Sequence, residues 1–423
     1  MKKILFIVGN YYPKPMANGV CAKNLIDDLE NRGFAIDVLC FKQPDSTINA
    51  QNIFTVKMNY RLHCFYQADN VKSKFIRLFY KIVGKLISVF KKIIFLPFLP
   101  FTNFTLSRRF YKKILELQDR NQYYGVVSIL NPFDGNLALA KLKKHNLLKT
   151  PWVVFCVDTL VNIKGKLNNN ASSSKYKPPF WYKYLLKYCD GYIFMQSRTD
   201  EYDCNELAQY KEKMIVGDLP MMVASKRNCS DLKTITFDMD VENWSYFGSI
   251  GGMHYYYQDL LNFYFSLPPN KKRCIHFFTR GQSFNESDFD RKDEWHNVII
   301  HGYVDVETME NAMKQTDIFI SLKYSNQISA KIFQYISYKK PIVHFSGNDR
   351  DPDVPYLSKY EKAIVLRTYN ESIEEMVNDF MSSNVFEGWV NSKEIEQLYE
   401  KNSPRYNNDR ILEVFDSFWR KLK

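Results

Sequence analysis

Short apolar runs alternate with amphipathic stretches along most of the chain. The apolar runs predict strands at residues 3–8, 35–41, 53–58, 125–130, 152–158, 192–196 and 214–217, and again at 244–248, 274–278, 298–303, 318–322, 341–345 and 363–366. The stretches between them have helical spacing at 20–31, 74–94, 107–118, 136–145, 179–188, 199–209, 257–266, 306–315, 330–338 and 372–381. Near-continuous apolar strands separated by helices are typical of parallel sheets with both faces covered. The pattern therefore predicts an α/β protein.

The alternation is interrupted once, by the polar residues 225–238, which predict a linker. A chain of 423 residues is also too long for one compact core. We predict a Rossmann-like doubly wound domain over 1–224 and a second one over 239–390. Helices in 391–423 are expected to pack back on the first domain. In this arrangement the carboxyl ends of the two sheets face each other across a cleft, where ligands bind.

The cysteines and the first residues indicate where the protein resides. The eight cysteines are scattered without a C-x-x-C pair, so we expect buried free thiols in a reducing compartment rather than disulfides or a zinc site. The apolar run at the N-terminus is too short for a signal peptide. No stretch reaches the roughly 18 uninterrupted apolar residues of a spanning helix. We therefore expect a cytoplasmic protein.

The net charge of +12 is concentrated in one segment, because residues 72–113 contain eleven basic side chains and no acidic one. Within it, residues 74–95 place basic side chains on one helical face, among them Arg77, Lys81, Lys85 and Lys92, and large apolar side chains on the other. A core-facing helix is one interpretation. An all-basic polar face opposite aromatic residues favours reversible contact with an anionic membrane surface. We expect no nucleic-acid partner, because no nucleic-acid-binding motif accompanies the basic stripe.

Two glycine-containing loops follow strands and are candidate anion sites. The loop over 8–19 precedes a helix N-terminus, whose amides attract anions, and its Asn18-Gly19 pair can adopt positive φ. The turn over 246–252 contains Ser249 and Gly251, whose backbone amides can form an anion-binding nest, and Arg280 at the next strand end can add charge. In both cases a plain turn is the alternative.

A third candidate anion site lies in residues 296–345. A strand there runs into a loop, and a helix begins after Ser329, a good N-cap residue, with Lys331 in its first turn. A lysine there opposes the helix dipole, and a bound diphosphate would reverse that cost. A solvated surface lysine is the alternative.

These segments resemble the family-4-type GT-B glycosyltransferases. The similarity is specific in 296–345, where a glycine, a strand and a helix precede Asp317-Ile318-Phe319-Ile320 and the K-x-x-Q-Y…K-P-I run from Lys331. It is weaker in 1–40. The resemblance implies a GT-B fold and a retaining, metal-independent transfer with a nucleotide-sugar as co-substrate and no other cofactor.

The resemblance also assigns roles to individual residues. Asn326 and Gln334 take the places of the two glutamates of the family's E-x7-E motif, which typically hold the donor sugar and the ribose hydroxyls. Ser249 stands where the family has an arginine that clamps the diphosphate. An amide still accepts a hydrogen bond from a hydroxyl. The donor-binding set is therefore Gly19, Ser249, Gly251, Arg280, Asn326, Ser329, Lys331 and Gln334.

Two carboxylates are candidates for proton transfer in the first domain. Asp134 and Asp158 follow successive predicted strands, at places where many family members have histidine. A carboxylate there can take the proton of an attacking hydroxyl, and capping of a helix is the alternative role.

The expected function is transfer of a sugar from a nucleotide-diphosphate-sugar to a lipid-linked acceptor at the inner face of the cell membrane. By analogy the setting is the synthesis of a surface polysaccharide such as capsule, exopolysaccharide or O-antigen. Two alternatives remain open: a non-catalytic partner with the same fold, and a nucleotide-sugar epimerase.

Overall fold

The computed structural model describes residues 1–11, 17–43, 52–71, 73–94, 104–157, 178–203, 205–223, 235–248, 256–279, 293–302, 304–323, 328–388 and 390–422. The chain forms two compact units. Unit 1 comprises Met1–Pro220 and Lys401–Lys423, and unit 2 comprises Met221–Glu400.

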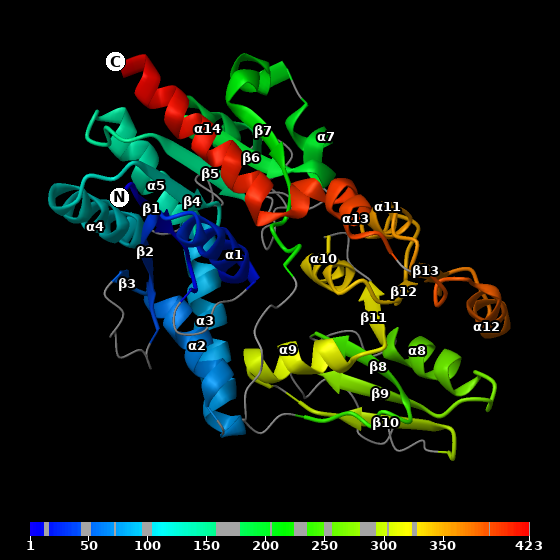
Figure 1. The fold of residues 1–423 in the computed structure, drawn as a ribbon. Coiled ribbons are helices and arrows are strands. Elements are labelled where there is room, and N and C mark those ends of the chain that lie inside the picture. Colours follow the sequence, from blue (N-terminus) through cyan, green and yellow to red (C-terminus); the bar gives the residue numbers. More distant parts are fainter. Residues whose placement is uncertain are drawn as a thin grey trace. The chain divides into compact units, whose positions relative to one another are not determined.

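Unit 1 contains a seven-stranded parallel sheet in the order β3-β2-β1-β4-β5-β6-β7 (Figure 1). Its strands are β1 (Lys3–Ile7), β2 (Ala35–Lys42), β3 (Ile53–Lys57), β4 (Gly125–Ile129), β5 (Trp152–Cys156), β6 (Gly191–Met195) and β7 (Met214–Gly217). The order reverses between β1 and β4, which makes the carboxyl edge there the expected ligand side of a doubly wound sheet. Inside the sheet, the buried Asp37 carboxylate accepts from the Tyr123 hydroxyl at 2.6 Å and pairs with Lys3 at 2.9 Å.

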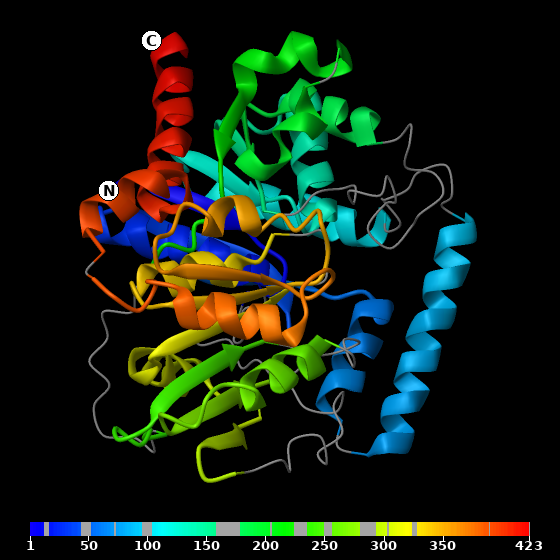
Figure 2. The same ribbon diagram turned by 90° about the vertical axis from the view of Figure 1, so that its right-hand side faces the viewer.

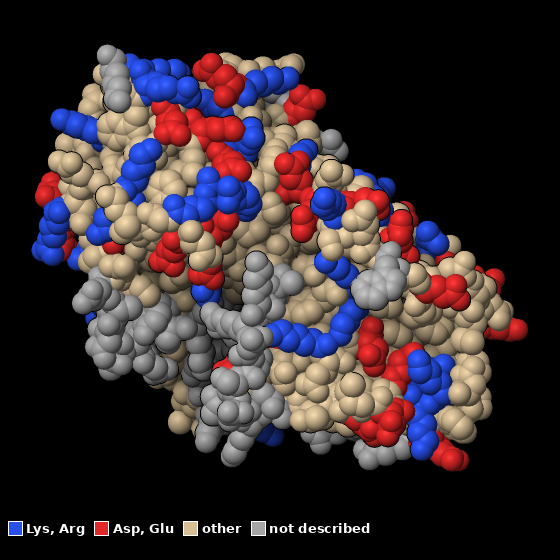
Figure 3. All heavy atoms as spheres, viewed as in Figure 1, with Lys and Arg blue, Asp and Glu red and all other residues tan. Residues whose placement is uncertain are grey.

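Helices cover both faces of this sheet. They are α1 (Ala17–Asn31), α2 (Tyr60–Asn70), α3 (Lys74–Ile94), α4 (Phe104–Arg120), α5 (Phe133–Lys144), α6 (Pro178–Tyr188), α7 (Thr199–Tyr202) and α14 (Pro404–Leu422). Side chains of α4, α5 and α6 share one apolar core with the strands. On the other face α14 packs along α1, β5 and β7. Figure 3 shows that Lys and Arg side chains alternate with Asp and Glu around α14, where Arg32 pairs with Asp409 at 2.8 Å.

Three glycines at the ends of strands make room for α14. A Cβ atom at Gly125 would lie 2.3 Å from the ring of Phe415. One at Gly191 would lie 2.9 Å from Val414, and one at Gly217 2.4 Å from the side chain of Asn407. These separations are far below van der Waals contact, so the glycines let α14 approach the sheet closely.

Unit 2 contains a six-stranded parallel sheet in the order β10-β9-β8-β11-β12-β13. Its strands are β8 (Glu242–Phe247), β9 (Arg273–Phe278), β10 (His296–Ile300), β11 (Ile318–Lys323), β12 (Ile342–Ser346) and β13 (Ala363–Arg367). Its helices are α8 (Tyr256–Phe265), α9 (Val306–Gln315), α10 (Ala330–Ser337), α11 (Val354–Leu357), α12 (Ile373–Ser382) and α13 (Ser392–Leu398). The strand order reverses between β8 and β11, so the carboxyl ends of these two strands mark the expected ligand side.

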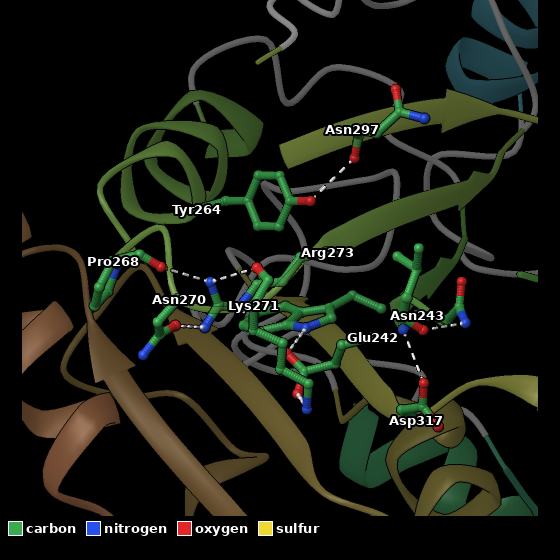
Figure 4. A network of polar contacts seen from close by, with 11 residues as sticks. Glu242, Asn243, Tyr264, Pro268, Asn270, Lys271, Arg273, Asn297 and Asp317 are labelled. Carbon is green, nitrogen blue, oxygen red and sulfur yellow. Dashed lines mark hydrogen bonds and ion pairs between the residues drawn. The ribbon is translucent and has the colours of Figure 1, made fainter. Parts of the chain in front are cut away.

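A polar network ties together the amino-terminal edge of the second sheet (Figure 4). Glu242 accepts from the Trp244 indole at 2.9 Å and pairs with Arg273 at 3.3 Å. The backbone N–H of Asn243 donates to the carboxylate of Asp317 at 2.8 Å. These polar groups pair with one another at the amino-terminal edge of the sheet, so we assign them a structural role. The ligand side is expected at the opposite, carboxyl-terminal edge.

The structure confirms the predicted fold class of two α/β units with parallel sheets, and all predicted strands are present within a few residues of their expected bounds. It corrects several helices. Instead of one helix over 199–209, the structure has the short α7 and a 3-10 helix over Asn205–Lys213. The helices expected in 391–423 are α13 and α14. The helices α2 and α11 were not predicted.

Three further expectations concern the linker, the C-terminal helices and the cysteines. Phe237, at the end of the predicted linker, is buried in unit 2 and stacks on His276, so this end of the linker belongs to the second core. Helix α13 belongs to unit 2, whereas the sequence predicts that it packs on the first domain together with α14. The described cysteines are free and buried, as expected: Cys21, Cys40, Cys64, Cys156, Cys189 and Cys274.

Candidate functional site

The start of α10 holds a lysine at the carboxyl end of β8. The ammonium of Lys331 donates to the carbonyl oxygen of Phe247, and burial lowers its pKa to about 8. A Cβ atom at Gly248 would lie 2.7 Å from Nζ of Lys331, so the glycine permits this approach. The arrangement places a desolvated cation beside the free amides of a helix N-terminus, where an anion is favoured.

A buried carboxylate supports the start of α10. Ser329 occupies the N-cap position, but its side chain makes no capping hydrogen bond. Its backbone N–H instead donates to Oδ1 of Asp353 at 2.8 Å. Oδ2 of Asp353 lies 3.4 Å from Nζ of Lys323, and burial raises the pKa of this carboxyl. Sequence analysis missed Asp353, because its partners are 24 and 30 residues away along the chain.

A histidine and a second aspartate extend this buried network. Nε2 of His344 lies 2.8 Å from Oδ2 of Asp351, and its Nδ1 lies 3.0 Å from the Ser321 hydroxyl. Ligand atoms of His344, Asp351 and Asp353 lie within 4.8 Å of one another, a spacing that a metal ion requires. However, the ammonium of Lys323 already faces Asp353 and would repel a cation. We therefore interpret the group as an ion-pair network that links the end of β11 and the start of α10 to the residues after β12.

Gln334 lies three residues after Lys331 on α10, so the two side chains share one helical face. Gln334 is partly exposed, and its amide can accept a hydrogen bond from a hydroxyl group. The other predicted donor contacts of this unit, Ser249, Gly251, Arg280 and Asn326, lie outside the described residues.

His276 within β9 and His301 directly after β10 form a hydrogen-bonded chain with fixed proton positions. The Asn243 side-chain NH₂ donates to the carbonyl oxygens of Asp238 and Val241, both at 2.8 Å, so its Oδ1 must accept from Nε2 of His276 at 3.0 Å. Nδ1 of His276 is then unprotonated and accepts from Nε2 of His301 at 2.9 Å. Burial lowers the pKa of both imidazoles, that of His276 to about 3. His301 therefore presents an unprotonated Nδ1 that can accept from a ligand N–H or O–H.

In unit 1, Asp134 lies in the first turn of α5, just after β4. Its Oδ1 is screened from solvent and has no hydrogen-bond partner. Burial raises the pKa of this carboxyl to about 7, although Lys91 and Arg61 partly oppose the rise. A carboxyl with a pKa near neutrality suits a general base. The second predicted carboxylate, Asp158, lies outside the described residues.

The glycine-containing loop after β1 differs from the expectation. Helix α1 begins at Ala17, so Asn18 and Gly19 lie in its first turn rather than in a loop. Neither has positive φ. The left-handed conformation that an Asn-Gly pair can adopt is not used here, because the two residues already follow the helical path. Gly19 is buried near the helix N-terminus.

Helix α3 has three different faces. Phe65 of α2 would lie 3.1 Å from a Cβ atom at Gly84, so one face packs on α2 (Figure 2). Lys81 and Lys85 are exposed on a second face. The third face is apolar, and its large side chains are exposed by 48 to 82%: Phe75, Phe79, Ile82, Leu86, Phe90 and Ile93.

The other two basic residues predicted for this surface differ from Lys81 and Lys85. Arg77 is partly buried and donates to the carbonyl oxygen of Val71 at 3.0 Å, so it lies toward the start of its own helix. The side chain of Lys92 lies outside the described part of the structure. Within the part of the chain that the structure describes, no helix has the length and hydropathy needed to cross a bilayer.

Comparisons with known proteins address the fold. No protein-family model matches the chain. No characterised protein matches it by sequence either. Among solved structures, one matched over 98% of this chain and 99% of its own has a TM-score of 0.56 at 10% identity, and its description is "Trehalose-6-phosphate from E. coli bound with UDP-2-fluoro glucose". A glycosyltransferase from Rickettsia africae matches over 99% and 98% of the two chains, with a TM-score of 0.55 at 11% identity.

A third solved structure belongs to a different reaction class. It is a putative UDP-N-acetylglucosamine 2-epimerase from Listeria monocytogenes, matched over 100% of this chain and 98% of its own, with a TM-score of 0.55 at 10% identity. The chain has the GT-B fold. GT-B structures include both transferases and epimerases that act on nucleotide-sugars, so the fold alone leaves the reaction open.

Proposed function

We propose that the protein is a glycosyltransferase that uses a nucleotide-diphosphate-sugar as donor. The main support is Lys331, a desolvated ammonium at the N-terminus of α10 and at the carboxyl end of β8. This combination suits a diphosphate, because the helix amides and the ammonium both face the same charge. The GT-B neighbours include a structure described as bound with UDP-2-fluoro glucose, which favours the same class of donor.

The remaining donor contacts of the proposal rest on the family resemblance. Gln334 would accept from a ribose hydroxyl, and Asn326 would contact the donor sugar. The phosphates would be bound by the backbone amides of Ser249 and Gly251 and by the charge of Arg280. The first turn of α10, which follows Ser329, would also bind them. Gly19 is proposed to lie near the phosphates and the acceptor. The retaining, metal-independent course that the family resemblance implies is part of the proposal.

Unit 1 is proposed to bind the acceptor. Asp134 would take the proton of the acceptor hydroxyl. The hydroxyl oxygen then bonds to the anomeric carbon of the sugar as the bond between that carbon and the diphosphate breaks. Asp158 is the second candidate for this step.

Helix α3 supports a lipid-linked acceptor at an anionic membrane surface. Its exposed apolar face adjoins the exposed Lys81 and Lys85, and this combination suits an interfacial helix. The protein would then act as a peripheral enzyme at the inner face of the cell membrane, in the synthesis of a surface polysaccharide.

Binding of nucleotide-sugars to the full chain tests the proposal. We expect calorimetric titration with UDP-, GDP- and CMP-sugars to reveal one preferred donor. Lys331→Ala should weaken its binding about tenfold or more, because a charge-assisted hydrogen bond is lost. Lys359→Ala removes an exposed lysine of the same unit and should leave the affinity unchanged. Absence of binding to every sugar tested would refute the enzyme proposal and favour a non-catalytic partner.

An epimerase is the second candidate, because one GT-B neighbour is described as a putative 2-epimerase. An epimerase converts its nucleotide-sugar without an acceptor, and the sugar remains attached to the nucleotide. Incubation of the preferred donor with the protein alone therefore separates the two reactions. Appearance of an epimeric nucleotide-sugar would exclude the transferase proposal.

A further inference from the structure

Three charged side chains from three helices of unit 1 influence one another electrostatically: Arg61, Lys91 and Asp134. Arg61 of α2 and Lys91 of α3 are both partly buried, and each influences the pKa of Asp134 on α5. Nε of Arg61 is screened from solvent without a hydrogen bond, and its guanidinium lies 5.7 Å from the ring centre of Phe65. Among the ion pairs of the described residues, none joins Asp134 to Arg61 or Lys91 within 4.0 Å.

The two cations repel each other in this position. Lys91 has a lowered pKa because of burial and, second, because of Arg61. Burial likewise lowers the pKa of Arg61. One carboxylate that contacts neither cation cannot neutralise both, so the group has an unbalanced positive charge in a partly desolvated place. An anion that contacted both cations would remove this cost.

The location of the cations indicates what such an anion is attached to. Lys91 directly follows Phe90 and lies two residues before Ile93, whose side chains are 66% and 68% exposed on the apolar face of α3. A hydrocarbon chain that covers this apolar face and carries the anion at its end would place the anion near Lys91, where α3 packs against α2. Arginine binds a phosphate through two parallel N–H groups, and lysine adds a point charge.

We propose that Arg61 and Lys91 bind the phosphate group of a phosphate-bearing lipid, with Asp134 beside it. This inference rests on the proposed function, in which such a lipid is the acceptor, and it specifies that acceptor as a phosphorylated amphiphile. Asp134 then has two effects of opposite sign. As a base it assists the reaction of a nearby hydroxyl, and as a negative charge it weakens the binding of the phosphate.

Octyl phosphate, below its micelle concentration, is a suitable probe for calorimetric titration of the full chain. We expect Arg61→Gln and Lys91→Gln each to weaken its binding about tenfold. Lys144→Gln removes the same charge from an exposed position of α5 and should change the affinity less than about twofold. Asp134→Asn should strengthen binding severalfold, which general damage to the fold would not do.

Inorganic phosphate forms the second arm, and it distinguishes a free anion from a lipid phosphate. Octyl phosphate should bind at least about tenfold more tightly, because its chain buries apolar surface on α3. Equal affinities would overturn the lipid assignment, and unchanged binding of octyl phosphate by the double variant Arg61→Gln/Lys91→Gln would overturn the site. Nucleotide-sugar binding, measured separately, decides the proposed function independently: it can fail while octyl phosphate binds, and the reverse is also possible.

Discussion

The protonation state of Asp134 in unit 1 is expected to affect both the stability of the protein and its catalysis. Burial raises the pKa of its carboxyl from an ordinary 3.8 to about 7. The folded protein therefore retains a proton between pH 3.8 and 7 that the unfolded chain releases. The stabilising contribution is complete below pH 3.8 and is lost as the pH rises through 7.

We therefore expect Asp134→Asn to raise the free energy of unfolding at pH 8 by about 2 kcal/mol, with a much smaller gain at pH 4. Urea unfolding of both proteins at the two pH values measures this difference. Asp119→Asn on the exposed surface of α4 is the control, and it should change stability little at either pH. A destabilised Asp134→Asn protein at pH 8 would contradict the burial of an unpaired carboxylate.

His276 is expected to act in the opposite direction. Burial and, second, the neighbouring His301 lower its pKa from 6.5 to about 3. The unfolded chain binds a proton below pH 6.5 that the folded protein does not. Stability is thus complete above pH 6.5 and is lost as the pH falls toward 3, by roughly 1.4 kcal/mol per pH unit for this group.

The variant His276→Phe keeps an aromatic ring against Phe237 and removes the titrating group. Between pH 7 and pH 5 we expect the wild type to lose about 2 kcal/mol more stability than this variant loses. His145→Gln alters an exposed histidine and should retain the wild-type pH dependence. If His276→Phe also retains it, His276 is not buried as a neutral imidazole.

At the scale of secondary-structure elements, α14 depends on glycines in the strands that it covers. Gly125→Ala would force a methyl group into the ring of Phe415 and should destabilise the protein by about 1 to 3 kcal/mol. In a Phe415→Ala background the same change should cost much less, because the space has been vacated. Denaturant unfolding of the four proteins of this cycle measures the coupling. An additive cycle would contradict the close packing.

Helix α3 gives a prediction about membranes. Lys81→Glu combined with Lys85→Glu should release the protein from vesicles that contain anionic lipid, with a loss of about 2 kcal/mol or more of binding free energy. Phe79→Ser combined with Phe90→Ser should weaken binding to the same vesicles by removing apolar side chains from the exposed face. The control is Lys144→Glu, which changes an exposed lysine of α5 and should leave vesicle binding unchanged. The neighbouring Lys143 is not suitable as a control, because it pairs with Asp190. Vesicle sedimentation that is equal for all variants would refute the membrane role.

The sequence predicted α3 with the bounds that the structure has, because its heptad-like spacing is strong over 21 residues. It did not predict α2, whose mixed pattern in Tyr60–Asn70 has little amphipathic character. Lys331 and Asp134 became candidate site residues because a local sequence pattern marks each of them. Arg61 and Asp353 were missed, because their importance arises from partners on other elements.

At the scale of the whole molecule, unit 1 is assembled from two stretches of chain, 1–220 and 401–423, with unit 2 between them in sequence. All of unit 2 leaves the ribosome before α14 does. Until α14 emerges, the sheet ends at Gly125, Gly191 and Gly217 lack the side chains that fill the space above them. The unit that is synthesised first is therefore completed last, and the second unit is the first that can finish its core during translation.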